Sequence, residues 1–496
     1  MREPKPSGRR TLRLTSVALA LSAVACAAQA ETLESALSRA YQANPALNSE
    51  RARLRSLDEN VAVAQAGYRP TATISADIGV QQFEGNLGGA GAGGGAVTGG
   101  AVGGAAGGAA GGGVGGVATT NSNPIFNFVT RPGGAGLTVN QNLFDGFRTD
   151  NRTRQAISNV LSNREAIRLT EMSTLFNAAQ AYMNVLRDTA NLELQRNNVE
   201  VLEEQLRQTR DRFNVGEVTR TDVAQAEARL AGARSQVGAA ESQLRSSIGI
   251  YRQNIGVEPR QLAPGRPLDR YVPANLEQAI MVGLREHPQI LASLHAVDTA
   301  ELQVKVAEGA LYPTAGIQGS VRQSYDSQLP NTSAVTAAIV GSVTIPLYQG
   351  GSEYAQIRQA KELVGQARLI AERDRDTVRS LVTQAWGRLE AAKAQVLASQ
   401  AQVQANEVAL NGVREEARVG QRTTLDVLNA QQELLNSRVN LILAQRDRVV
   451  NSYDVVQSIG RLTVRYTALP VTPYSPKEHY DQVKDLWFGV GTPDGR

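Results

Sequence analysis

Four segments, each roughly ten residues long, alternate apolar and polar side chains at every second position. They cover residues 71–83, 136–144, 314–325 and 337–347. Successive side chains of a strand point to opposite faces of a sheet, so each segment predicts a strand with one apolar and one polar face. In the first segment, Ile74 and Ile78 share the apolar face and Asp77 lies on the polar face. This length and period are typical of outer-membrane strands, although a soluble hairpin can show the same alternation.

Aromatic residues flank the four predicted strands at two levels. Tyr68, Phe144, Tyr312 and Tyr348 mark one level, and Phe83 and Tyr325 mark the other. Aromatic side chains are enriched where membrane-spanning elements cross the two membrane–water interfaces. We therefore expect the two aromatic levels to correspond to the two faces of a membrane.

Each pair of predicted strands is followed by a very long helical segment. Residues 148–212 contain neither proline nor glycine, and at 1.5 Å per residue they predict a helix roughly 95 Å long. Within 352–417, apolar or small residues recur at alternating spacings of three and four, which is the seam of a coiled coil. Gly216 and Gly420 follow the two long segments and predict turns that send the chain back.

Shorter helices complete this order of elements. They are predicted over 33–43, 46–67, 221–254, 275–285, 289–310 and 424–458. Pro45 and Pro288 separate the members of the two early pairs, because proline disfavours the helical conformation at the residue before it. The order of two helices, two strands, a long helix and a return helix therefore occurs twice.

The chain is an internal duplication, with repeats over 31–260 and 261–465. Asn44-Pro45 matches His287-Pro288 at an offset of 243 residues, whereas Val215-Gly216 matches Val419-Gly420 at an offset of 204. An insertion in the first repeat explains the change of offset.

The insertion coincides with a glycine-rich segment. Of residues 85–116, 18 are glycine. This composition predicts a flexible loop over 85–118, which we expect on the external side of the membrane.

The two ends of the chain differ from the repeats. Residues 1–30 have a basic start, a short apolar run and the small-residue sequence Ala28-Gln29-Ala30, which together predict a secretory signal peptide. Cys26 lies inside it, and a lipidation signal there remains an alternative. Removing the signal's five basic residues and one glutamate from the chain's 51 and 47 leaves 46 of each. Residues 466–496 contain four prolines and predict a C-terminal tail that lies along the outside of the helices near their middle or is partly disordered.

Four strands are too few to close a membrane barrel, for which about eight are needed. Unpaired strand edges are excluded in lipid, so several chains must share one barrel. A helix of roughly 95 Å also exceeds the thickness of any membrane, so the helices must extend into water. Strands in a membrane and long helices below it indicate a duct.

The chain resembles the TolC family of outer-membrane factors over nearly all of residues 31–465. The resemblance is carried by the duplication, by Gln141-Asn142-Leu143-Phe144-Asp145-Gly146, and by two turn motifs. The motifs are Arg212-Phe213-Asn214-Val215-Gly216 with Thr221-Asp222-Val223, and Arg418-Val419-Gly420 with Leu425-Asp426-Val427-Leu428.

The resemblance implies a mixed α and β fold with four transmembrane β-strands per chain. These strands would join a shared 12-stranded trimeric β-barrel, continued by long coiled-coil helices that form a periplasmic α-barrel. The implied protein is a homotrimer in the lipid of the outer membrane. It would work with a periplasmic adaptor protein and an inner-membrane ABC or RND-type transporter. Its cargo would be proteins by type I secretion, drugs and other toxic small molecules, or both.

The resemblance also implies a gate at the periplasmic entrance, held shut by polar links between neighbouring helices at the turns. In the matching positions, Arg422 would reach Asp222 and Thr221. Asp426 would point into the bore and form part of an acidic ring. The family often has a second inward aspartate one helical turn later, where this chain has Asn429. The expected gate is therefore weaker, and its entrance binds cations less well.

Two other classes of function fit the sequence less well. An enzyme is disfavoured, because the three histidines and the carboxylates show no spacing typical of a catalytic or metal site. We therefore predict no cofactor, and the balanced charge after removal of the signal gives no reason to expect nucleic acid as a partner. A non-channel periplasmic coiled-coil scaffold is the alternative, but it does not account for four amphipathic strands with aromatic flanks.

Overall fold

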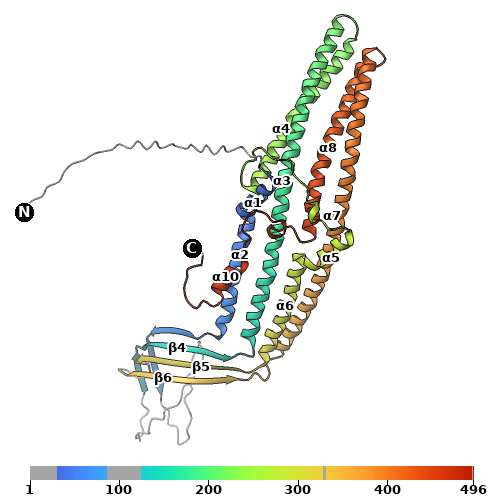
Figure 1. Ribbon diagram of the computed structural model, residues 1–496. Helices are drawn as coiled ribbons and strands as arrows, with labels where there is room; N and C mark the ends of the chain where they lie inside the picture. The colour runs from blue at the N-terminus through green and yellow to red at the C-terminus, as the bar shows by residue number, and fades with distance from the viewer. Residues whose placement is uncertain (1–30, 87–124, 328–330, 494, 496) are drawn as a thin grey trace, which may run out of the picture.

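The structure is a computed structural model that describes residues 31–86, 125–327, 331–493 and 495. The predicted signal peptide and residues 87–124, which include most of the predicted glycine-rich loop, lie outside the described residues. Long helices run from a β-sheet at one end of the molecule to two helical hairpin tips at the other (Figure 1).

The elements follow the duplicated order expected from the sequence. The first repeat contains α1 Leu33–Ala43, α2 Pro45–Gln65, η1 Ala66–Tyr68, β1 Thr71–Ile78, β2 Gln81–Asn86, β3 Ile125–Thr130, β4 Gly133–Phe144, α3 Arg148–Asn214 and α4 Arg220–Ile255. The second contains η2 Asp269–Tyr271, α5 Leu276–Glu286, α6 Pro288–Glu308, η3 Gly309–Leu311, β5 Thr314–Tyr325, β6 Ser333–Thr344, α7 Ser352–Arg418 and α8 Thr424–Ser458. The tail adds α9 Val464–Thr467 and α10 Pro476–Val483.

The predicted strand over 71–83 is wrong as a single element. The structure divides it into β1 and β2, because the pairing partner is interrupted by Pro132, which has no N–H to donate. The Gly79 N–H donates to the Pro132 carbonyl at 2.7 Å, and β2 then pairs with β3 in a separate two-stranded sheet. This second pair already includes Gly85 and Asn86, which the sequence assigned to the loop.

The other strands keep their predicted positions but not all of their bounds. β4 begins at Gly133 rather than 136, since its early glycines conceal the alternation of side chains. β6 covers Ser333–Thr344 instead of 337–347. Within the described residues, one antiparallel sheet has the order β1-β4-β5-β6, so the strands of the two repeats meet where β4 pairs with β5.

Side chains at the helix ends explain where the short helices begin. The Asn44 side chain accepts hydrogen bonds from the N–H groups of Ala46 and Leu47 and thereby caps α2. His287, its counterpart in the second repeat, accepts from the Gln289 N–H and caps α6. Each cap precedes a proline at the first helical position, where the missing N–H has no partner to lose. The two different residues thus perform the same structural role.

α3 and α7 each contain 67 residues, which corresponds to about 100 Å. Their bends into α4 and α8 occur at Gly216, with φ of 81°, and Gly420, with φ of 79°. This left-handed conformation is easily adopted by glycine and is a common way to end a helix. Among the described residues, no helix has the length and apolar character needed to cross a bilayer.

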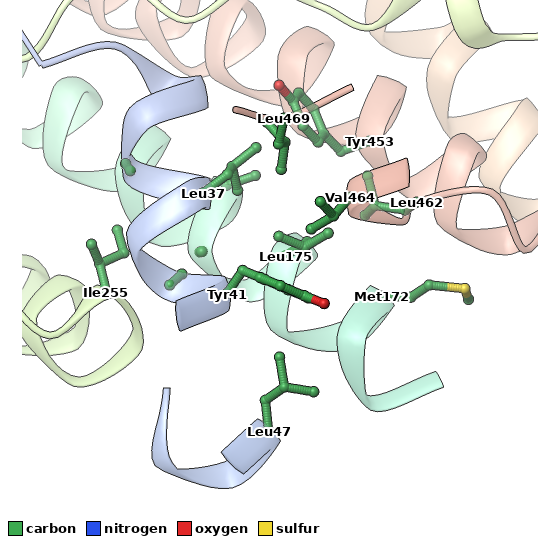
Figure 2. Close-up of a cluster of buried hydrophobic side chains, with 14 of the residues drawn as sticks. Leu37, Tyr41, Leu47, Met172, Leu175, Ile255, Tyr453, Leu462, Val464 and Leu469 are labelled. Atoms are coloured by element: carbon green, nitrogen blue, oxygen red, sulfur yellow. The ribbon is translucent and has the colours of Figure 1, made fainter. Parts of the chain in front are cut away.

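The largest apolar core joins the first repeat to the end of the second (Figure 2). It combines Leu37 and Tyr41 of α1 with Leu175 of α3, Tyr453 of α8 and Val464 of α9. The beginning and the end of the chain therefore pack together in this core, where the short helices and the tail lie against the long helices.

A buried tyrosine connects this core to the segment between the repeats. The Tyr182 side chain is fully buried, and its hydroxyl lies 2.6 Å from the carbonyl oxygens of both Glu31 and Ala263. Burial raises the pKa of Tyr182 to about 12, so the hydroxyl keeps its proton at neutral pH. It can therefore share its one proton between the two carbonyl oxygens and join the two chain segments that meet there.

Replacing this hydroxyl tests its role in stability. Tyr182→Phe should lower the free energy of unfolding by about 1–3 kcal/mol, because the Ala263 carbonyl loses its hydroxyl partner and the Glu31 carbonyl keeps only the Ala263 N–H. Urea unfolding of the detergent-solubilised protein, followed by circular dichroism, measures the change. Tyr348→Phe is the control, since Tyr348 is 77% exposed. An equal effect of the two substitutions would contradict this assignment.

Candidate functional site

The four-stranded sheet has one apolar and one polar face. Cross-strand partners share a face, and the register places Ile74 beside Leu137, Leu137 beside Val321, and Val321 beside Ala337. The other face carries Thr73, Thr138 and Ser320, which are also aligned across the strands, and Thr336, which lies opposite Arg322. The register thus unites the apolar positions that alternation had predicted separately for each strand.

The apolar face of the sheet is exposed in the single chain. Ile74 is 82% exposed, Ile78 92% and Ile339 84%. Exposed apolar patches of this kind mark surfaces that meet another protein or a membrane. β1 and β6 form the two edges of the sheet, and the structure pairs the outer side of neither with another described strand.

An ion pair crosses the polar face of the sheet. Arg322 on β5 donates to Asp77 on β1 at 2.5 Å, passing over β4, which lies between them. β4 has Gly134 and Gly136 beneath the arginine. A Cβ atom at Gly134 would lie 3.1 Å from Arg322 Nη2 and 2.7 Å from the Gln323 carbonyl oxygen. The absence of side chains at Gly134 and Gly136 therefore gives Arg322 its path to Asp77.

The predicted interface aromatics occupy the two ends of the strands. Tyr68, Phe144, Tyr312 and Tyr348 lie at the helical end, and Tyr325 at the far end of β5. Tyr312, Tyr325 and Tyr348 are exposed, whereas Phe144 packs edge-to-face against Phe147 with ring centroids 5.1 Å apart. For Phe83 the structure describes the backbone of β2 but not the side chain. Their contact with a membrane interface stays a prediction.

At the opposite end of the molecule, both hairpin tips carry the same capping arrangement. Asp222 accepts from the N–H and hydroxyl of Thr219, whose own hydroxyl accepts from the Asp222 N–H. Asp426 and Thr423 repeat this reciprocal box at the start of α8. The box satisfies N–H groups that have no partner inside the helix.

These hydrogen bonds also shift the acidities of the two aspartates. The Thr219 hydroxyl, and then its N–H, lower the pKa of Asp222. The Thr423 N–H, and then its hydroxyl, lower the pKa of Asp426. Both carboxylates therefore remain ionised at neutral pH, so each tip holds one negatively charged aspartate at the start of its return helix.

The structure of the single chain does not bring together the residues assigned to the gate by resemblance. Arg422 Nε donates to Glu416 at 2.8 Å, within its own turn. Asp222 is engaged by Thr219, and the only hydrogen bonds described for Asp426 are with Thr423. For Thr221, the described hydrogen bonds include none to Arg422. The gate therefore stays a prediction.

A different polar contact joins the two hairpins. Arg229 on α4 donates to the Asn429 side-chain oxygen on α8 at 2.9 Å. Beside it, an apolar cluster combines Leu206 and Leu230 of the first hairpin with Leu428 of the second. Sequence reasoning missed Arg229, because this residue belongs to neither turn motif. Arg229 lies 13 residues after Gly216, whereas Asn429 lies 9 residues after Gly420. The two residues are therefore not equivalent in the two repeats, and the sequence gave no sign that they would be in contact.

Ion pairs within the hairpins reproduce the duplication. Arg234 binds Glu203 at 2.7 Å between α3 and α4, and Arg438 binds Glu407 at 2.7 Å between α7 and α8. Corresponding members are 204 residues apart, which is the offset found in the sequence. Because all four side chains are largely exposed, each pair contributes about 0–1 kcal/mol and mainly aligns the helices.

Among the described residues, no group of three or more His, Cys, Asp or Glu is arranged to hold a metal ion. The notable features are instead an exposed apolar sheet face and two helical tips with matching capping boxes, about 100 Å of helix away. The profile of one protein family, described as outer membrane efflux protein, matches residues 36–252 and 282–461, one segment in each repeat.

The chain belongs to the outer membrane efflux protein family. It is 39% identical over 492 residues to outer membrane efflux protein BepC of Brucella suis biovar 1, covering 97% of this chain and 98% of the relative. It is 27% identical over 352 residues to outer membrane protein TolC of Escherichia coli, covering 66% and 69% of the two chains. The TolC-family resemblance is thereby confirmed.

The fold agrees with this assignment. The structure of the Campylobacter jejuni CmeC outer membrane channel superposes with a TM-score of 0.71 at 16% identity, covering 91% of this chain and 89% of that one. Proteins of this family are efflux channels rather than enzymes. The protein is therefore an outer-membrane export channel, with its helical part in the periplasm.

The glycine path beneath Arg322 can be tested by substitution. Gly134→Val should destabilise the sheet by about 1–3 kcal/mol, because its side chain would overlap the Gln323 carbonyl and obstruct Arg322. The measured quantity is the fraction of protein that forms heat-resistant oligomers in the outer-membrane fraction. Gly319→Val is the matched control, as no atom lies within 4 Å of the position of its Cβ. Equal loss in both variants would contradict the proposed path.

The capping boxes predict a pH-dependent stability of the tips. A carboxylate with a lowered pKa stabilises the folded helix above its ordinary pKa of 3.8, and this effect is lost as the pH falls through the lower folded value. At pH 7, Asp426→Ala should accelerate amide exchange in the first turn of α8 about fivefold. The difference from the unsubstituted protein should vanish on acidification.

Hydrogen exchange with mass spectrometry, corrected for intrinsic rates, measures this effect. Glu433→Ala on the same helix is the control, because Glu433 takes no part in the box. A difference at pH 7 that persists unchanged well below pH 3.8 would show that the carboxylate charge does not act through the cap.

Proposed function

We propose that three copies of the chain form a trimeric channel-tunnel that exports substrates across the periplasm and the outer membrane. Each copy contributes β1, β4, β5 and β6 to a shared barrel of 12 strands. The helices of the three copies continue the barrel as a periplasmic tube. An inner-membrane transporter delivers the cargo through a periplasmic adaptor protein.

The observation that carries this proposal is the sheet with two free edges and one exposed apolar face. In lipid, β1 and β6 need partners for their outer N–H and C=O groups, and symmetry-related copies can supply them. The apolar face would then meet lipid, and the polar face with Asp77 and Arg322 would line the bore. In a soluble scaffold, an apolar face of this kind would remain exposed to water, which is unfavourable.

The hairpin tips are proposed as the closed entrance of the tube. The link between Arg229 and Asn429 holds the two hairpins of one chain together. Arg422 would exchange Glu416 for Asp222 and Thr221 when the chains assemble. Three copies of Asp426 would place negative charge around the opening, where nearby carboxylates reinforce each other's potential. Asn429 in place of a second acid keeps this charge lower.

The cargo is proposed as toxic small molecules, with export of proteins as the further possibility that this duct allows. The relative BepC is named an efflux protein, and its similarity covers nearly the whole of both chains. Selection of cargo would occur at the transporter, because a passive tube offers few specific contacts. A deletion strain that gains sensitivity to toxic compounds while still secreting its proteins would support efflux alone.

Conductance in a planar bilayer tests the duct and its gate. The unsubstituted trimer should show a small conductance, and Arg229→Ser and Arg422→Ser should each raise it several-fold by releasing the tips. Arg438→Ser is the matched control, because its ion pair joins α7 to α8 within one hairpin. If correctly assembled trimers of all variants fail to conduct, the channel is excluded. Equal conductance in all of them would reject the gate residues.

Block by a trivalent cation from the periplasmic side tests the acidic ring. Asp426→Asn should weaken the block about tenfold or more, because three negative charges are removed from one opening. The asparagine can still accept hydrogen bonds from Thr423, so this variant separates the charge from the helix cap. Unchanged block in Asp426→Asn would place the cation site elsewhere.

A further inference from the structure

The end of the C-terminal tail carries a compact group of large apolar side chains that the fold leaves in solvent. Leu486, Trp487, Phe488 and Val490 are all exposed, with Phe488 at 90% and Trp487 at 58%. The rings of Trp487 and Phe488 are 6.5 Å apart and form one surface. The group is separate from the strands and from the helical tips described above.

Arg69 holds this group beside the start of the barrel strands. Its Nη1 donates to the Leu486 carbonyl oxygen at 2.6 Å, and its guanidinium carbon lies 4.8 Å from the centroid of the Trp487 ring. Arg69 is followed by Pro70 and β1 and preceded by Tyr68. The tail therefore reaches the level at which the helices give way to the sheet.

The segment before this group is fixed on the first repeat. His479 on α10 lies 3.1 Å from Asp58 of α2, which is fully buried. Arg164 of α3 lies against the Tyr480 ring at 5.1 Å from its centroid. α10 thus follows α2 towards the sheet, as Figure 1 shows for the short red helix beside the blue one. Its docking delivers Trp487 to a defined position.

The duplication gives a reason for an aromatic residue at this position. The second repeat has Tyr312 immediately before Pro313 and β5, and this side chain is 52% exposed. The first repeat has Arg69 at the corresponding place, 243 residues earlier. The indole of Trp487, stacked on the Arg69 guanidinium, adds an aromatic ring at this position, next to Tyr68.

We infer that residues 486–490 form a lipid anchor that inserts into the periplasmic leaflet of the outer membrane. Tryptophan is favoured at membrane interfaces because its ring is apolar while its N–H remains near water. In this arrangement Phe488 and Val490 insert deeper into the acyl chains than Trp487 does. The charge of Arg69 then lies at the depth of the lipid phosphates. This inference rests on the membrane insertion of the strands proposed above.

The chain has two tryptophans, Trp386 and Trp487, which allows a direct test. In Trp386→Phe the fluorescence comes from the anchor alone, and in Trp487→Phe it comes from α7 alone. A third protein combines both substitutions with Ile339→Trp and reports on β6. Each full-length trimer is reconstituted in phosphatidylethanolamine and phosphatidylglycerol vesicles that contain lipids brominated near the headgroup end of the acyl chains.

Trp487 should show blue-shifted emission and be quenched at least about twofold more strongly than Trp386, as expected for an indole at the interface. The tryptophan at position 339 should also be quenched. If the tryptophan at position 339 is quenched and Trp487 is not, the lipid anchor is refuted, whereas the insertion of the strands is supported. Blue-shifted Trp487 emission without quenching would assign the group to a neighbouring subunit. If neither site is quenched, the proposed insertion itself fails.

Discussion

Backbone hydrogen bonding at the two edges of the sheet restricts the surroundings and the assemblies in which this chain can be stable. The N–H and C=O groups on the outer sides of β1 and β6 have no partner among the described strands. In water they could bind solvent, but the exposed Ile74, Ile78 and Ile339 side chains favour an apolar surrounding. Lipid satisfies these side chains and at the same time forbids open edges. In the proposed trimer, other copies of the chain would meet both requirements, because each β6 can pair with the β1 of a neighbour.

The remainder of the molecule positions this sheet and extends it. The large core around Tyr182 fixes the short helices, the segment between the repeats and the tail at one level. From there α3 and α7 run to the tips, where the Thr219 and Thr423 boxes close the turns. Duplication explains why Arg234 and Arg438 form equivalent ion pairs, whereas Arg229 and Asn429 form a contact that joins the two hairpins. One chain therefore supplies two similar helical hairpins and the contact that links them.

Local patterns were sufficient to predict most of the fold. All predicted helix bounds lie within two residues of the structure, because Pro45, Pro288, Gly216 and Gly420 impose strong local conformations. The break at Pro132 was missed, since an uninterrupted alternation through Gly79 looks like one strand until its partner is known. The path of Arg322 over Gly134 and the contact of Arg229 with Asn429 join residues 188 and 200 positions apart. Such contacts depend on packing and leave no periodic signal. The gate at Arg422 came from resemblance alone, and contacts between chains decide it.

The stoichiometry of the assembled protein tests the account most directly. Native mass spectrometry of the full chain, extracted from outer membranes in mild detergent, measures how many copies share one barrel. A shared barrel predicts a complex with three times the mass of one mature chain, which gives 12 strands and no free edge. A stable monomer in the membrane would contradict it, because a four-stranded sheet would then have to keep two unpaired edges in lipid.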